Sequence, residues 1–394
     1  MKLGSQVLAL VLGTSLAAGQ ETSTSVLFLG NSYTAGNNVP GLFASLAQAG
    51  GHAVVIDAHT PGGNTLGYPQ PNGLQHASNP TSLGKIAAQA WDVLVLQEQS
   101  FLPTVAAAQE GSMKPGAIAL EAALAASSPT GRTLMYSTWG RENGGQLCGF
   151  GGCSPVFADM QAMTDHLSVA YWDVALEIGG EVAPVGQAFV AALALDPTLD
   201  LYAADGSHAS LQGSYLAACT FYASVFGESP VGLGFGAGLP AGIVATLQAA
   251  AEGVTPAIPP SCTPASGYGP GALGSGVAGS NQIGLGLSGE AELGGVLTLN
   301  SSALPLVANP LWVAIGAGSA QLPFASGTLL VDPALLVMPL VPGFHFPLTG
   351  SAAHQLVLPV SPQLLGLVLY AQSFMIGVQG ELLLSNGLQF GLCP

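Results

Sequence analysis

The sequence predicts an α/β domain with a parallel sheet, followed by an all-β sandwich domain. From residue 25 to about 252, short apolar runs alternate with stretches of helical period, which is the pattern of βαβ units. The run Val93-Leu94-Val95-Leu96 is continuously apolar, as in a strand buried on both faces. Beyond about residue 253, short apolar runs are separated by Gly, Pro, Asn and Ser, which indicates a sandwich.

The α/β part is expected to contain five strands and four helices. The strands are predicted over residues 25–30, 52–59, 92–96, 132–137 and 181–185. The helices are predicted over 40–48, 105–126, 155–178 and 209–226. The first helix has Asn37 or Asn38 as its cap and Pro40 in its first turn, both typical of a helix N-terminus.

The second part is expected to consist of strands only. They are predicted over residues 295–299, 311–315, 327–331, 355–360, 365–372 and 381–384. The resulting domain plan is a leader at 1–19, an α/β domain at 20–252, a Pro/Gly-rich linker at 253–272 and a β module at 273–394.

Charge is scarce and strongly acidic. The 394 residues include 21 Asp or Glu and 5 Lys or Arg, a formal net charge of −16, and 49% are hydrophobic. Nucleic-acid binding is excluded because it needs clustered basic residues, and disorder is excluded because disordered chains are poor in apolar residues. The long uncharged stretch 333–380 is interrupted by prolines, so we expect no transmembrane segment in the mature chain.

The N-terminus predicts export. Lys2 is followed by the apolar run Val7–Leu12 and by Ala17-Ala18-Gly19, which is the layout of a secretory signal peptide. A buried first helix is the alternative. We expect a secreted protein, extracellular, periplasmic or at the cell surface.

Five cysteines agree with an oxidising destination. Cys148 and Cys153 flank a Gly-rich loop that a small disulfide can close, and Cys262 and Cys393 lie at the two edges of the β module and can form a second one. Cys219 lies in a helical pattern and is interpreted as a buried free thiol. No cysteine or histidine cluster has zinc spacing, so neither a metal nor an organic cofactor is expected.

Two short motifs indicate nucleophilic catalysis. Ser32 follows the first strand in Gly30-Asn31-Ser32-Tyr33-Thr34, and parallel α/β sheets bind ligands at this strand end. A serine nucleophile needs a base, usually His, which in turn needs an orienting carboxylate. Asp205-Gly-Ser-His208 places both on one turn just before the last predicted helix.

These two blocks resemble the first and last blocks of the SGNH (GDSL-like) hydrolases. The resemblance covers roughly residues 24–230, with Asn31 where the name-giving motif has Asp. It implies a flavodoxin-like three-layer α/β/α sandwich, with Ser32 as nucleophile, His208 as base and Asp205 as its orienting partner.

The same resemblance implies an oxyanion hole made of three donors. They are the N–H of Ser32, a glycine N–H after the second strand, where Gly63 is preferred to Gly62, and a side-chain amide after the third strand. There the family pattern G-x-N-D is replaced by Gln97-Glu98-Gln99-Ser100, which resembles an uncharacterised bacterial branch of the superfamily. The amide donor is Gln99, with Gln97 as the competing choice.

Other residues near the site have weaker assignments. Asn64, Trp139 and Arg141 are candidate substrate contacts, and Trp139 and Arg141 are alternatively a packed loop held by Cys148 and Cys153. Glu98 is interpreted as a surface carboxylate rather than as an anchor of its loop or a residue that tunes His208.

These features predict a secreted serine esterase that hydrolyses O-acetyl or short acyl esters, on a small molecule or a carbohydrate, through an acyl-enzyme. The alternative is a weakly active or inactive binding or adhesive protein whose β module engages a surface or glycan. That module resembles the Gly/Pro-rich β modules at the ends of many exported bacterial proteins. Neither the identity of the ester nor the oligomeric state follows from the sequence.

Overall fold

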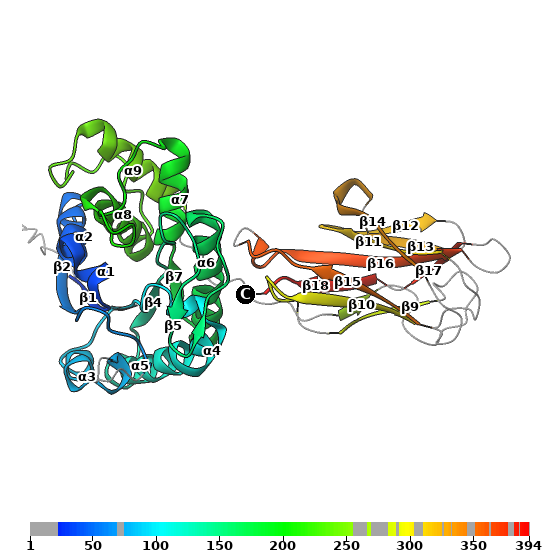
Figure 1. The fold of residues 1–394 in the computed structure, drawn as a ribbon, viewed down its shortest axis with the longest axis horizontal. Coiled ribbons are helices and arrows are strands. Elements are labelled where there is room, and N and C mark those ends of the chain that lie inside the picture. Colours follow the sequence, from blue (N-terminus) through cyan, green and yellow to red (C-terminus); the bar gives the residue numbers. More distant parts are fainter. Residues whose placement is uncertain are drawn as a thin grey trace, which may run out of the picture.

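The computed structural model describes two sets of elements, an α/β part and a β part (Figure 1). The described residues are 23–68, 75–254, 266–268, 283–288, 291–302, 310–324, 327–331, 333–344, 351–361, 364–376, 382–385 and 387–393. The predicted leader at 1–19, Cys262 and most of the predicted linker lie outside these residues.

The α/β part is built on a five-stranded parallel sheet. Its strands are β1 (Thr24–Leu29), β2 (Val54–His59), β3 (Val93–Leu96), β4 (Arg132–Tyr136) and β7 (Glu181–Ala183). They lie in the order β2-β1-β3-β4-β7, and every neighbouring pair is parallel. This is the 2-1-3-4-5 order of flavodoxin-like doubly wound folds. The last strand is shorter than predicted and ends before Pro184, which lacks the N–H a strand needs.

Helices cover both faces of this sheet. They are α1 (Ser32–Ala35), α2 (Val39–Ala49), α3 (Pro80–Ala87), α4 (Ala106–Ala108), α5 (Lys114–Ser127), α6 (Met160–Ile178), α7 (Val185–Leu195), α8 (Leu211–Phe226) and α9 (Ala241–Gly253). Helices α2, α8 and α9 lie on one side of the sheet and α3 and α5 on the other (Figure 1). Side chains of β1 alternate accordingly: Phe28 packs in the cluster that contains Phe43 and Phe221, and Leu27 in the cluster that contains Leu120 and Tyr171.

The β part consists of antiparallel sheets, as predicted. Strands β9 (Gly284–Ser288), β10 (Val296–Ser302) and β15 (Ala352–Val357) form one sheet in the order β15-β10-β9. A second sheet has the order β14-β11-β16-β18-β8, with β17 paired to β16. Its strands are β8 (Ser266–Tyr268), β11 (Pro310–Gly316), β14 (Leu336–Phe344), β16 (Val368–Ile376), β17 (Leu382–Leu384) and β18 (Gly387–Gly391). Strands β12 (Ser319–Phe324) and β13 (Gly327–Val331) form a hairpin.

One core joins the two sheets of the β part. Leu297 and Leu299 of β10 pack in the same cluster as Val313 of β11 and Phe390 of β18. The sheets therefore face each other across an apolar layer, which is the arrangement of a sandwich. No helix in the described part of the chain is long and apolar enough to cross a bilayer.

Candidate active site

Ser32 lies at the carboxyl end of β1, in a turn held by buried hydrogen bonds. The Gln97 side-chain carbonyl accepts from the Asn31 N–H and from the Thr34 hydroxyl, at 2.9 Å each. Asn31 caps the short helix α1 by accepting from the Tyr33 N–H at 3.1 Å. A Cβ at Gly30 would lie 2.4 Å from Thr34 Oγ1 and 2.7 Å from Gln97 Oε1, so only glycine allows this turn to close.

The structure brings Ser32, His208 and Asp205 together. Ser32 Oγ lies 2.9 Å from His208 Nε2, and His208 Nδ1 lies 2.5 Å from Asp205 Oδ2. Asp205 Oδ1 also accepts from the backbone N–H groups of Ser207 and His208, at 2.9 Å each. The hydrogen bond from His208 is the largest factor that lowers the pKa of Asp205, to about 2. Both side chains remain accessible, with exposed fractions of 43% for His208 and 50% for Asp205.

An aromatic stack ties the turn of Ser32 to the loop of His208. The ring of Trp139 lies parallel to Tyr33 at 4.7 Å and to Phe189 at 4.3 Å. Its Nε1 donates to the Ser207 carbonyl at 2.9 Å, and the Tyr33 and Ser207 hydroxyls lie 2.7 Å apart. Trp139 is 1% exposed and does not line the cavity over Ser32, so it supports the site from beneath rather than touching what occupies it.

That cavity has a volume of about 240 Å³ and is lined mainly by polar residues. Its lining residues are Asn31, Ser32, Tyr33, Gly63, Gln99, Ser100, Arg141, Asp205, Ser207 and His208. No leucine, isoleucine, valine, methionine or phenylalanine of the described chain is among them. Asn31, Tyr33, Ser100 and Ser207 line the cavity although none was predicted as a site residue. Asn31 and Tyr33 directly adjoin Ser32, and Ser207 adjoins His208.

The two candidate glutamines have different surroundings. Gln97 is fully buried and is not among the lining residues, because its amide is used within the turn of Ser32. Gln99 lines the cavity, as Gly63 does. Its Oε1 accepts from the N–H groups of Phe101 and Leu102, at 3.0 and 3.3 Å, so its Nε2 is the end left for other contacts, and it lies 3.2 Å from Ser100 Oγ.

The interpretation of Glu98 as a surface carboxylate is wrong. Its side chain is fully buried and accepts hydrogen bonds from the Leu66 N–H, at 3.1 Å to the nearer oxygen, and from the Gln99 N–H at 2.6 Å. Its own N–H donates to the Tyr171 hydroxyl. Burial raises the pKa of Glu98 to about 8. The carboxyl group therefore joins the loops that follow β2 and β3.

Asn64 does not line the cavity. It is fully buried, its carbonyl accepts from Asn31 Nδ2 at 2.9 Å, and its own Nδ2 lies 2.9 Å from His76 Nε2. His76 Nε2 also lies 2.9 Å from the Gly30 carbonyl, and burial lowers the pKa of this histidine to about 4. Asn64 and His76 thus connect the loop after β2 to the turn of Ser32 without lining the cavity. Within the described residues, no cluster of His, Cys, Asp and Glu has the make-up of a metal site.

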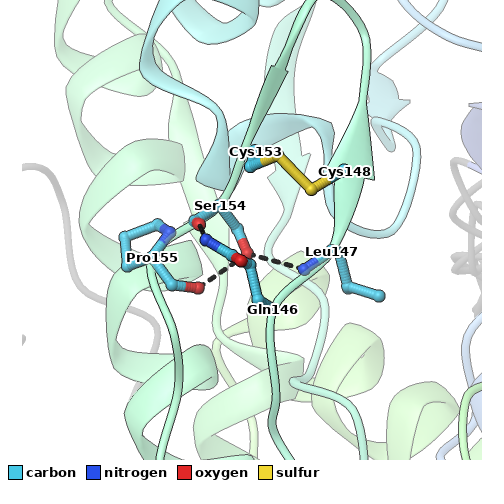
Figure 2. Close-up of a disulfide and its surroundings, with 6 residues drawn as sticks. All are labelled: Gln146, Leu147, Cys148, Cys153, Ser154 and Pro155. Atoms are coloured by element: carbon cyan, nitrogen blue, oxygen red, sulfur yellow. Dashed lines mark hydrogen bonds between the residues drawn. A yellow bond between two sulfur atoms is a disulfide. The ribbon is translucent and has the colours of Figure 1, made fainter.

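A small disulfide hairpin covers the loop that follows Gln99. Cys148 and Cys153 are bonded and belong to the paired strands β5 (Cys148–Gly149) and β6 (Gly152–Cys153) (Figure 2). At its base, Ser154 Oγ accepts from the Leu147 N–H at 3.0 Å (Figure 2). At its tip, Phe150 contacts Phe101, with ring centroids 5.0 Å apart.

The remaining described cysteines differ in state. Cys219 is a buried free thiol, as predicted. Cys393 is disulfide-bonded, and its predicted partner Cys262 lies outside the described residues.

Comparison with known proteins returns structural neighbours only. No family model and no curated protein sequence matches the chain. A DUF4886 family protein from Bacteroides uniformis has 18% identity and a TM-score of 0.49, and the match covers 59% of this chain and 94% of that one. A candidate GDSL-like lipase from Parabacteroides merdae has 16% identity and a TM-score of 0.38, with 52% and 97% covered. The native aryl esterase of M. smegmatis has 15% identity and a TM-score of 0.37, with 52% and 99% covered.

The structural neighbours of this chain include GDSL-like lipases and esterases, all at low identity. The fold class itself rests on the strand order of this chain.

Proposed function

We propose that this protein is a serine esterase that hydrolyses O-acetyl or other short acyl esters. The observation that supports it most is the hydrogen-bonded series from Ser32 Oγ through the His208 ring to the Asp205 carboxylate. A hydroxyl within 2.9 Å of an imidazole nitrogen can lose its proton to that nitrogen as it attacks a carbonyl carbon. Asp205 holds the ring so that Nε2, and not Nδ1, faces Ser32.

The proposed reaction has two halves. Ser32 Oγ bonds to the ester carbonyl carbon while His208 takes its proton. His208 then gives that proton to the departing alcohol, which leaves an acyl group on Ser32. A water molecule, deprotonated by His208, attacks the acyl group and releases the carboxylic acid. In both halves the carbonyl oxygen becomes negative and is stabilised by the N–H groups of Ser32 and Gly63 and by the amide of Gln99.

The cavity supports the choice of a short acyl group. A volume of about 240 Å³ lies below the roughly 300–1,000 Å³ of most small-molecule sites. Its lining includes no Leu, Ile, Val, Met or Phe side chain along which a long acyl chain would be desolvated. An acetyl group fits such a site, whereas a fatty acyl chain gains little from it.

Export is part of the proposal. The Lys2 leader pattern and the Cys148–Cys153 bond both agree with an oxidising destination outside the cytoplasm. In this view residues 20–252 form the hydrolase domain, 253–272 the linker and 273–394 a β module.

The test is hydrolysis of 4-nitrophenyl acetate by the wild-type protein and by Ser32→Ala. We expect a Ser32-dependent rate, with kcat lowered by roughly 10³-fold or more in the variant. Ser45→Ala on helix α2 is a matched control, because its hydroxyl bonds only the Gly41 carbonyl of its own helix. A fluorophosphonate probe should also label the Ser32 peptide, as read by mass spectrometry. Equal, near-zero hydrolysis and no labelling would instead support the binding or adhesive alternative.

A further inference from the structure

Arg141 is set apart from the other described cations by its lack of a carboxylate partner. The other three each form an ion pair: Lys85 with Asp57, Lys114 with Glu110 and Asp173, and Arg132 with Glu181. No carboxylate of the described chain lies within salt-bridge distance of Arg141. In a chain with 21 acidic and 5 basic residues, an unpaired guanidinium stands out.

The position of Arg141 is fixed by its neighbours. The preceding residue, Gly140, donates its N–H to Thr164 Oγ1 at 2.8 Å and accepts at its carbonyl from the Tyr202 hydroxyl at 2.8 Å. A Cβ at Gly140 would lie 2.4 Å from the Met160 carbonyl oxygen, so this backbone is packed against α6. The loop therefore holds Arg141 at the wall of the cavity that contains Ser32.

The Arg141 guanidinium has more N–H donors than the described residues accept. Its Nη2 donates to Ser100 Oγ at 3.3 Å, whereas its Nε is buried without an acceptor among the described residues. Arginine has five N–H donors in a planar fork, and this fork matches the two oxygens of a carboxylate. Arg141 and Ser100 both line the cavity, so the Nη end of the guanidinium, which bonds Ser100, is the end that a group entering the cavity can meet.

The other charged residues near the cavity do not pair with Arg141. Asp205, which lines the same cavity, is already paired with His208. Glu142, the next residue in the chain, is exposed and lies against Gly206, with its N–H bonded to the Gly206 carbonyl at 3.0 Å. Neither carboxylate therefore neutralises Arg141.

We propose that Arg141 binds a carboxylate of the substrate, so that the preferred substrates are anionic esters with a carboxylate within reach of the scissile carbonyl. This inference rests on the proposed esterase function and narrows its substrate class. The carboxylate can belong to the acyl part or to the alcohol part of the ester, and a separate pair of test substrates addresses each case.

Matched pairs of esters test the proposal. On the acyl side the pair is 4-nitrophenyl hydrogen adipate and its methyl ester. On the alcohol side it is 4-acetoxybenzoate and its methyl ester. Rates measured with Ser32→Ala are subtracted to remove spontaneous hydrolysis. In at least one pair we expect kcat/KM to be about tenfold or more higher for the anionic member, as for a charge-assisted, paired hydrogen bond. This preference should shrink in 0.5 M NaCl because salt screens the attraction.

Three variants test whether Arg141 causes the preference for the anionic ester. Arg141→Met should bring the ratio of anionic to neutral kcat/KM close to one. Arg141→Lys keeps the charge but lacks the fork, so an intermediate ratio is expected. Lys85→Met removes the same charge from the pair with Asp57 and should leave the ratio unchanged, which controls for net charge. A ratio near one in the wild type for both pairs, with Ser32-dependent hydrolysis intact, overturns the inference and leaves the esterase proposal standing.

A binding measurement does not depend on turnover. Isothermal titration calorimetry with the Ser32→Ala protein should give about tenfold tighter binding of 4-acetoxybenzoate than of its methyl ester, a difference lost in Ser32→Ala/Arg141→Met. If no ester is hydrolysed by the wild type, this comparison still decides whether Arg141 binds carboxylates. Equal affinities for the two esters would then refute it.

Discussion

The buried carboxylate of Glu98 accepts a hydrogen bond from the Leu66 backbone N–H at 3.1 Å, which joins the loop after β3 to the loop after β2. These two loops supply Gln99 and Gly63 to the same cavity. The distance between the two proposed oxyanion donors is therefore set in part by a side chain that does not touch the cavity.

The first prediction concerns Glu98 and pH. Because burial raises its pKa to about 8, whereas the unfolded chain titrates near 4.5, the folded state binds more protons between these values. The contribution of Glu98 to the free energy of unfolding should therefore fall as pH rises from about 4.5 to 8. Glu98→Gln lacks this contribution, so over this range its free energy of unfolding should rise relative to that of the wild type by a few kcal/mol, at roughly 1.4 kcal/mol per pKa unit. Urea unfolding at pH 5, 6.5 and 8 measures it, and parallel curves for the two proteins would contradict it.

The second prediction separates Gln99 from Gln97. Gln99→Ala should lower kcat for 4-nitrophenyl acetate by roughly 10²–10³-fold, the usual effect of losing one oxyanion donor. The stability of Gln99→Ala should fall less than that of Gln97→Ala. Of the two N–H groups that bond the Gln99 side-chain carbonyl, that of Leu102 keeps the Gln99 backbone carbonyl as an acceptor, and Phe101 is only partly buried.

Gln97→Ala is the companion variant and should mainly destabilise the fold. It leaves the Asn31 N–H and the Thr34 hydroxyl without their acceptor, at about 1–3 kcal/mol for each buried group. Kinetics and urea unfolding of both variants give the comparison. The reverse pattern, with a stable Gln97→Ala that loses only kcat, would assign the donor to Gln97.

The third prediction concerns Asp205. Its pKa of about 2 keeps it ionised at every pH above about 4, so the acidic limb of the pH–rate profile should not reflect this carboxyl. Asp205→Asn should lower kcat by roughly 10²–10⁴-fold because the neutral amide favours the wrong His208 tautomer. The depressed pKa also means that any stability from this pair is present above about pH 4 and is lost as pH falls toward 2. An unchanged kcat at pH 7 would remove Asp205 from the mechanism.

The fourth prediction concerns the disulfide hairpin. Cys148 and Cys153 are separated by five positions, so their bond closes a short loop and should contribute about 2 kcal/mol in the chain-entropy model. Cys148→Ser/Cys153→Ser should lower the free energy of unfolding by this amount in urea. Because both proteins keep the disulfide at Cys393, dithiothreitol should destabilise the wild type by about 2 kcal/mol more than the double variant. Equal effects of dithiothreitol on the two proteins would mean that the Cys148–Cys153 bond contributes nothing to stability.

The sequence was sufficient for the sheet and for the proximity of Asp205 and His208. Parallel strands place their carboxyl ends at one edge, and two residues three positions apart on a single turn can hydrogen-bond without help from the rest of the fold. It was not sufficient for Glu98, because the N–H of Leu66 that binds it belongs to a loop 32 residues earlier. A carboxylate next to a polar loop is ordinarily solvated, and only the assembled structure shows this one buried.

The alternatives for Trp139, and the choice between Gln97 and Gln99, could not be decided from the sequence for a related reason. A tryptophan after a strand can point into the cavity or beneath it, and the choice is made by Tyr33 and Phe189, which are distant in sequence. Gln97 and Gln99 leave the strand on the same side. They differ because the Asn31 N–H donates a hydrogen bond to the side-chain carbonyl of Gln97, which keeps that amide within the turn of Ser32.

The exposure of His208 and Asp205 bears on the size of the molecule that the proposed esterase could cleave. With 43% and 50% of these side chains accessible, the rim beside them is not enclosed. In the proposed reaction the acyl portion has to enter the cavity, whereas the part of the alcohol that lies beyond the cavity can extend into solvent. An ester group that projects from a long polymer could therefore reach Ser32 with the polymer itself remaining outside.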